Sequence, residues 1–306
     1  MNELRILISG ASGLVGAAAT IALRADGHEV GHLVRSRGSL STGDVRWDPA
    51  AGTADQEAME GASAIVHLAG AGIGDSRWAE ARKKILCSSR VDSTRILVDA
   101  ISKLRQKPRV LLAASATGFY GNRGDELLAE SSAAGSGFLA VLARAWEGES
   151  LRAESLGVRT VLLRFGMILS AQGGALPKVI TPFKFGVGGR LGSGNQWMSW
   201  IALDDVIGVI RAALADEAFS GPVNVVAPNP LRNVDFTRAL ARALHRPAIL
   251  PAPAFALRLA LGREMADELL LSSQRVQPQK LIAAGYAFRF PELDPALKTI
   301  LTQRDA

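Results

Sequence analysis

Three glycines near the N-terminus have the spacing of a phosphate-binding turn. Gly10, Gly13 and Gly16 lie between an apolar run at 4–8, of strand length, and an Ala- and Leu-rich stretch at 17–25, which should be helical. In such a unit the first glycine permits a tight turn, the second lets the backbone approach a pyrophosphate, and the third lets helix and strand pack closely. Free N–H groups at the helix start favour the phosphates. The pattern predicts a dinucleotide site; the alternative is an ordinary turn between core elements.

The following strand ends in a basic residue. Residues 29–34 form a strand-like run, and Arg35 follows it, with Ser36 and Arg37 behind. An NAD site usually places Asp or Glu here to hold the ribose hydroxyls, whereas arginine suits a 2′-phosphate. We therefore predict NADP(H) as the cofactor, with a solvated basic loop as the alternative.

Composition narrows the class of protein. The 306 residues are 48% hydrophobic and 21% charged, which is typical of a soluble globular chain with one large domain or two lobes. The single cysteine, Cys87, excludes an internal disulfide, and four scattered histidines predict no metal site. The net charge of +6 is spread along the chain and does not favour nucleic acid. Without an apolar run of ~18 residues or a signal peptide, we expect a cytoplasmic protein that does not contact membranes.

The order of elements predicts an α/β fold. Strand-like and helix-like runs alternate through the first two thirds of the chain, as in a Rossmann-type doubly wound parallel sheet. We expect a cofactor domain at 1–165 plus about 203–225. Residues 166–202 and 226–306 should form a smaller mixed α/β substrate lobe, with a small helical subdomain at about 250–300.

Several motifs together resemble one family. They are SGASGLVG (9–16), HLAGAGIGDSRW (67–78), SRVDSTRILVDAI (89–101), SATGFYG (115–121), GSGNQWMSWIALDDV (192–206), VAPNP (226–230) and EMADELLLSSQRV (264–276). The chain resembles the extended short-chain dehydrogenases/reductases, in the sugar-nucleotide-epimerase-like branch of the NAD-dependent epimerase/dehydratase family, with its C-terminal domain of unknown function. The resemblance covers nearly the whole chain and is compatible with a homodimer formed through the helices at 89–101 and 138–156.

The resemblance also implies a set of site residues. Those expected around the cofactor are Gly10, Ser12, Gly13, Leu14, Val15 and Gly16 at the pyrophosphate, Arg35 at the 2′-phosphate, Leu68, Ala69 and Gly70 at the adenosine ribose, and Arg90, Ser115 and Arg164 further along. Ser115 matches the serine that hydrogen-bonds the reacting oxygen in active relatives. Arg90 stands where relatives usually have Asn.

Two departures from the family pattern concern catalysis and substrate. Active relatives carry Tyr-x-x-x-Lys on the helix after the fifth strand, where lysine lowers the tyrosine pKa for proton exchange. Here that helix reads GFLAVLARAWE and holds neither residue. Relatives also have an arginine that grips the substrate diphosphate, but residues 198–200 are Met, Ser and Trp. Arg164 or Arg190 is a candidate replacement.

Other residues are candidates for the missing chemistry. Tyr120 is a possible proton donor, although a tyrosine before glycine in a turn is more often structural. Thr117 would assist Ser115 in holding an oxygen. Glu147 would be a base or, alternatively, a surface helix carboxylate. Trp78, Trp197 and Trp200 would wall the site or belong to the core.

The sequence supports two functions. The first is an NADP(H)-dependent oxidoreductase or epimerase that acts on a carbonyl or hydroxyl of a small-molecule substrate, with Ser115 polarising the oxygen. The second is a catalytically silent NADP(H)-binding sensor, which the loss of both Tyr and Lys favours.

Overall fold

An eight-stranded sheet forms the middle of the molecule and confirms the predicted doubly wound fold. The computed structural model describes residues 3–35, 40 and 42–302. The strands lie in the order β12 (Gly221–Val225), β8 (Arg159–Phe165), β6 (Val110–Ala116), β5 (Ala64–His67), β1 (Arg5–Ser9), β2 (Glu29–Val34), β3 (Val45–Asp48) and β4 (Thr53–Ala54). Parallel pairing joins the strands from β12 to β3, and β4 runs antiparallel to β3.

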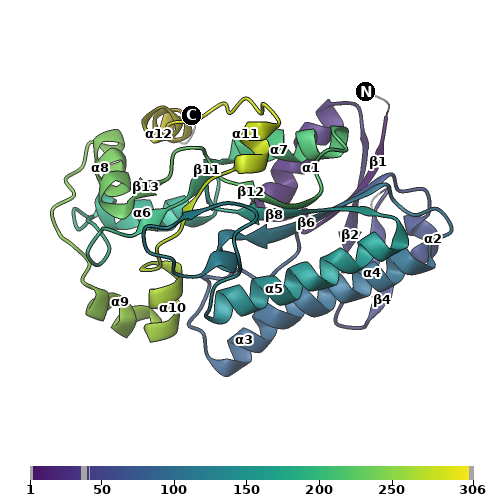
Figure 1. Cartoon of the computed structure of the whole chain (residues 1–306), viewed down its shortest axis with the longest axis horizontal. Coiled ribbons are helices and arrows are strands. Elements are labelled where there is room, and N and C mark those ends of the chain that lie inside the picture. The colour runs from purple at the N-terminus through teal and green to yellow at the C-terminus, as the bar shows by residue number, and fades with distance from the viewer. Residues whose placement is uncertain (1–2, 36–39, 41, 303–306) are drawn as a thin grey trace.

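Helices cover both faces of this sheet (Figure 1). One face carries α4 (Ser93–Lys103) and α5 (Phe138–Leu151), with α3 (Glu80–Cys87) and the short α2 (Gln56–Met59) on the same side. A π-helical turn over Ser88–Asp92 connects α3 to α4. The other face carries α1 (Leu14–Ala25), α7 (Leu203–Ala215) and α11 (Gln279–Ala283).

The coverage of both faces accounts for the apolar strands. Ile6 and Ile8 pack with the cluster beneath α1 and α7, whereas Leu7 between them packs with the cluster beneath α4. Because successive side chains alternate between faces, a strand covered on both sides is apolar throughout. Two polar side chains, Ser9 and His67, stand at the carboxyl ends of β1 and β5, and both are fully buried.

A smaller mixed lobe follows β8. In it, β9 (Met167–Leu169) pairs with β11 (Trp200–Ala202), and β10 (Trp197–Met198) pairs with β13 (Leu231–Arg232). Its helices α6 (Ala175–Lys184), α8 (Asn233–Leu244) and α12 (Leu293–Thr302) pack in one apolar cluster with Trp200. Because Trp200 is completely buried, it is a core residue and does not wall the site.

The C-terminal segment returns to the first lobe. After α9 (Ala254–Leu261) and α10 (Arg263–Leu269), strand β14 (Arg275–Val276) pairs with β7 (Leu127–Leu128) in the loop after β6. The residues after α10 therefore lie beside a carboxyl end of the main sheet. Within the described ranges, no helix is long and apolar enough to cross a membrane.

Candidate cofactor and active site

The glycine turn lies where the strand order of the sheet reverses. Strand β1 stands between β2 and β5, so the chain builds the sheet first on one side of β1 and then on the other. In open parallel sheets, ligands bind in the crevice beyond the carboxyl ends of the strands at this point. Gly10 closes the turn with a φ of 71°, and a Cβ on it would lie 2.8 Å from the carbonyl carbon of Leu68. The close approach of the turn to the end of β5 therefore requires glycine.

Helix α1 begins with backbone donors that have no intrahelical partner. Gly13 is its N-cap, and within the described part of the chain no side chain caps the helix and its first turn holds no acidic residue. A Cβ on Gly16 would collide with the Gly10 carbonyl oxygen, so this glycine keeps helix and turn together. Ser12 and Gly13 are exposed, and Leu14 is half-buried, as is Val15 beside it. A pyrophosphate would meet free N–H groups and a positive helix end here, so these residues fit the predicted cofactor.

A buried hydrogen-bond chain fixes the end of β5. The Ser9 hydroxyl oxygen accepts from the backbone N–H groups of Leu68 at 3.1 Å and Ala69 at 3.2 Å, so its own proton goes to His67 Nδ1 at 2.7 Å. His67 Nε2 then donates to Thr94 Oγ1 at 2.9 Å, which also accepts from Trp146 Nε1 at 3.0 Å. This chain connects the predicted adenosine-ribose segment, Leu68 to Gly70, with α4 and α5.

His67 should make stability depend on pH. Complete burial lowers the pKa of His67 from 6.5 to about 4, so the imidazole is neutral in the folded protein at pH 7. Below pH 6.5 the unfolded chain binds a proton that the folded chain does not, so stability should fall as the pH drops from about 6.5 toward 4. We expect a loss of roughly 3 kcal/mol over this range. Urea unfolding at several pH values measures it, and His67→Asn should remove this part of the pH dependence; an unchanged profile would contradict the assignment.

The two cationic candidates for the cofactor differ in environment. Arg35 is exposed directly after β2, at the same edge of the sheet as the glycine turn, while Ser36 and Arg37 lie outside the described residues. Arg90 lies in the π-helical turn, donates from Nη2 to the Ala71 carbonyl at 2.9 Å, and lies against Gly70. Burial lowers the pKa of Arg90 to about 10. Arg90 thus secures the loop after β5, whereas Arg35 is exposed and has no side-chain partner among the described residues.

At the end of β6, Ser115 belongs to a buried ionic network. Its hydroxyl donates to Glu147 Oε1 at 2.6 Å, and Arg164 binds both Glu147 oxygens at 2.8 Å. Burial alone would lower the Arg164 pKa, but the Glu147 carboxylate raises it above its usual value. Glu147 is only 5% exposed, so the alternative of a surface helix carboxylate is wrong.

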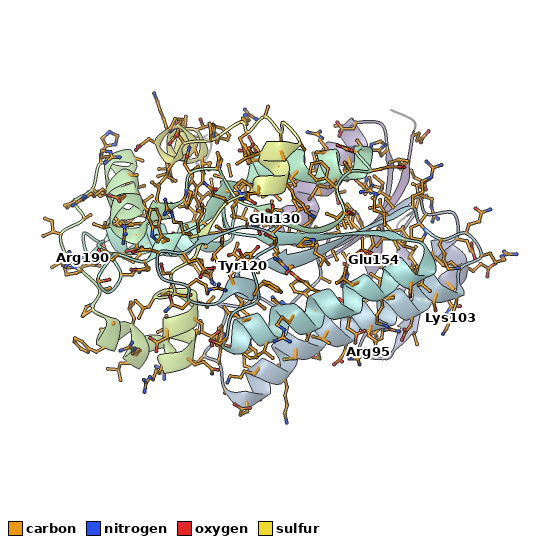
Figure 2. The ribbon with its side chains drawn as sticks, viewed as in Figure 1. Arg95, Lys103, Tyr120, Glu130, Glu154 and Arg190 are labelled. Atoms are coloured by element: carbon orange, nitrogen blue, oxygen red, sulfur yellow. The ribbon has the colours of Figure 1, made fainter. Side chains whose placement is uncertain are left out.

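Tyr120 belongs to the same network and is joined to it by a hydrogen bond from Arg164. The Tyr120 hydroxyl donates to Asn224 Oδ1 at 2.7 Å and accepts from Arg164 Nη1 at 2.9 Å. Figure 2 shows Tyr120 in the middle of the molecule and Arg190 at one end. Tyr120 is fully buried and its pKa is raised by burial, although Arg164 opposes the shift. This geometry favours the structural interpretation of Tyr120 and corrects the assignment of Arg164 to cofactor or diphosphate.

The remaining candidates fall into two groups. Thr117 follows Ser115 at the end of β6, is nearly buried, and its hydroxyl has no hydrogen-bond partner among the described residues. Trp78 packs edge-on against Phe138 and belongs to a small apolar cluster. Trp197 is half-buried between two arginines and donates to Asp125 Oδ1 at 2.6 Å. Of these three candidates, Thr117 has a hydroxyl without a partner among the described residues, and it lies at the carboxyl end of β6.

A cavity of about 230 Å³ lies between the first lobe and the C-terminal segment. It is lined by Gly118, Gly121, Asn122, Ser136, Gly137, Leu139, Asp267, Glu268, Ser272 and Gln274. The motif at 264–276 contains Asp267, Glu268, Ser272 and Gln274, but the sequence analysis assigns them no role, because only the fold brings them together with the other two segments of the lining. Within the described part of the chain, no group of three or more His, Cys, Asp or Glu side chains is arranged to hold a metal ion.

Comparison with known sequences identifies the family. The pattern of the NAD dependent epimerase/dehydratase family matches residues 6–226, and that of a domain of unknown function, DUF1731, matches residues 252–300. The chain belongs to the NAD-dependent epimerase/dehydratase family. This confirms the resemblance that the motifs indicated. Thus the cavity lies between residues of the family domain and residues of the C-terminal domain.

The relatives match nearly the whole of this chain. An epimerase family protein of Mycobacterium leprae is 39% identical over 298 residues, which are 97% of this chain and 96% of the relative. The human epimerase family protein SDR39U1 is 35% identical over 301 residues, which are 97% of this chain and the whole relative. The crystal structure of human SDR39U1 with NADPH is 34% identical, with a TM-score of 0.89 over 98% of this chain and 99% of that one. A nucleoside-diphosphate sugar epimerase of Corynebacterium glutamicum is 35% identical, with a TM-score of 0.81 over 98% of this chain and 58% of that one.

Proposed function

We propose that this chain binds NADP(H) at the glycine turn. The observation that carries the proposal is the uncapped start of α1 beside Gly10, at the reversal point of the sheet. Arg35 supports the phosphorylated form of the cofactor, since it is an exposed cation at the end of β2. The similarity to human SDR39U1, whose structure contains NADPH, supports the same choice.

Arg35→Asp should reverse the preference between the two nicotinamide cofactors. We expect the Kd for NADPH to rise roughly 30-fold, because a cation that faces the 2′-phosphate becomes an anion. The Kd for NADH should change less than about threefold, since NADH has no phosphate there. Titration calorimetry with both cofactors measures this. If the Kd values for NADPH and NADH rise equally, Arg35 has a structural role and does not contact the 2′-phosphate.

We further propose that the protein is an oxidoreductase or epimerase. A bound nicotinamide supplies hydride acceptance or donation. The hydroxyls of Ser115 and Thr117 at the end of β6 would hold the reacting oxygen. Because Ser115 gives its proton to Glu147, its oxygen can accept a hydrogen bond from a substrate hydroxyl, whereas Thr117 has a free proton to donate.

Ser115→Ala should separate catalysis from cofactor binding. We expect NADPH turnover with a panel of carbonyl compounds to fall by roughly 100-fold, because the variant loses the Ser115 oxygen that accepts from the hydroxyl formed as the carbonyl is reduced. Affinity for NADPH should change less than about threefold. The measurement is NADPH oxidation followed by absorbance, with binding titrated on the same sample. Unchanged turnover would remove Ser115 from the mechanism.

A silent NADP(H)-binding sensor is the second candidate. It is favoured by the environment of the polar groups near β6, since the Ser115 proton is held by Glu147 and the Tyr120 hydroxyl is buried among Asn224 and Arg164. A sensor should bind NADPH and oxidise it with no compound of the panel. Turnover that Ser115→Ala abolishes would exclude it.

A further inference from the structure

We infer that the cavity beside Gly118 receives the substrate, and that this substrate is a small polar molecule without an anionic group. The inference rests on the proposed function, because it assigns the substrate of the same site. Gly118 follows Thr117 directly, so the cavity begins where β6 ends and where the reacting oxygen would lie. The opposite wall comes from the C-terminal segment, at Asp267 and Glu268 and at Ser272 and Gln274.

The neutral polar groups of the cavity are available to a ligand. Among the described residues, the side chains of Ser136, Ser272 and Gln274 have no hydrogen-bond partner. Asn122 uses its Oδ1 to accept from the Ser273 N–H at 3.0 Å, which leaves its amide donors free. These groups offer both donors and acceptors, so they suit hydroxyl, carbonyl or amine groups of a ligand.

The charges around the cavity oppose an anion. Its lining contains two carboxylates and, in the described structure, neither Lys nor Arg. Glu268 accepts from the N–H groups of Phe138 and Leu139, both at 2.8 Å, and so occupies the positive start of α5. Asp267 pairs with Arg258 at 2.8 Å, which removes that guanidinium as a ligand for phosphate. A phosphate in the cavity would meet two carboxylates and, among the described lining residues, neither Lys nor Arg.

The size of the cavity and the placement of nearby arginines argue against a sugar nucleotide. A volume of about 230 Å³ is below the roughly 300–1,000 Å³ of pockets for drug-sized ligands. Arg164 is buried against Glu147, and Arg190 is exposed at one end of the molecule (Figure 2). Arg232 pairs with Asp125 at 3.0 Å. None of these three arginines is placed to bind a diphosphate in this cavity. This agrees with the absence of arginine at 198–200, which are Met, Ser and Trp.

Ligand-detected NMR on NADPH-loaded protein tests the inference. The probes are a fragment library with equal shares of neutral, cationic and anionic compounds, together with glucose, glucose 6-phosphate and UDP-glucose. Ser272→Phe should fill the cavity and raise the Kd of the ligands that bind there by at least about tenfold. Ser155→Phe, at an exposed position of the 3-10 helix Arg152–Leu156, is the matched control. We expect the fragments that Ser272→Phe displaces to be neutral or cationic, and we expect UDP-glucose not to compete with them.

Two results would overturn the inference. One is that the displaced fragments are mainly anionic, or that UDP-glucose competes with them. The other is that no fragment responds to Ser272→Phe. If Ser272→Phe fails to fold, a second variant, Gln274→Lys, serves as the test. It should bind anionic fragments at least about tenfold more tightly than the unmodified protein does. No gain in affinity would likewise overturn the inference. NADPH titration of the same samples separates this failure from failure of the proposed cofactor site.

Discussion

Gly13→Asp should abolish cofactor binding while the fold remains as stable as before. Aspartate is a favourable N-cap, and Gly13 has a φ of −79° and a ψ of 169°, which any residue adopts. The new carboxylate would bind the free N–H groups of α1, where we place the pyrophosphate. We expect the Kd for NADPH to rise at least about 100-fold, because one anion replaces another at the same donors.

The stability of the same variant distinguishes this mechanism from unfolding. A Cβ at residue 13 would lie 3.2 Å from the Gly10 carbonyl oxygen, a tight but tolerable distance. The free energy of unfolding should therefore stay within about 1 kcal/mol of the original. Gly13→Ser caps the helix without adding a charge, and it should raise the Kd for NADPH by only about tenfold. Equal losses from Asp and Ser, or undiminished binding by the Asp variant, would contradict the placement of the phosphates.

Glu147→Ala should cost more stability than any surface change. Removal of the carboxylate leaves the Arg164 guanidinium buried without a counter-charge, and it leaves the Ser115 hydroxyl without its acceptor. Breaking a buried ion pair in this way costs about 3–5 kcal/mol, a large share of the total stability of a typical domain. Urea unfolding should show this as a lower midpoint with an unchanged slope.

Two controls separate the ionic cause from loss of packing. Glu147→Leu combined with Arg164→Met removes both charges and should recover at least half of the lost free energy. Asp99→Ala breaks an ion pair with Arg152 in which both side chains are about half exposed, and should cost less than about 1 kcal/mol. If the double variant is no more stable than the single one, the network is held by packing and not by charge compensation.

Local features of the first lobe follow from the sequence. The mainly apolar runs at 64–68 and 109–115 predict β5 and β6 to within one residue, since strands covered on both faces consist mostly of apolar residues. Gly27 predicts the end of α1, and its φ of 86° is a conformation that glycine adopts readily. The three glycines of the turn could also be predicted, because the need for glycine there comes from the backbone of the local strand–turn–helix unit.

Contacts between distant segments do not follow from the sequence. The sequence left two roles for Glu147, a base or a surface carboxylate, because nothing in the sequence of its helix shows that Arg164 faces it from β8. Glu268 caps α5 from a residue 130 positions away, and no local pattern indicates this. Asparagine is a typical N-cap residue, but Asn233 is the first residue of α8 after the N-cap Arg232, and its side-chain oxygen accepts from the Leu191 N–H at 2.8 Å. In each case a tertiary partner decides the role of a polar side chain.

The central claim is that the glycine turn and Arg35 form an NADP(H) site, and calorimetric titration of the unmodified protein with NADPH and NADH tests it most directly. We expect one NADPH per chain, bound with a Kd in the micromolar range or below and at least about tenfold more tightly than NADH. If neither cofactor binds, the turn is only part of the fold and both proposed functions are wrong.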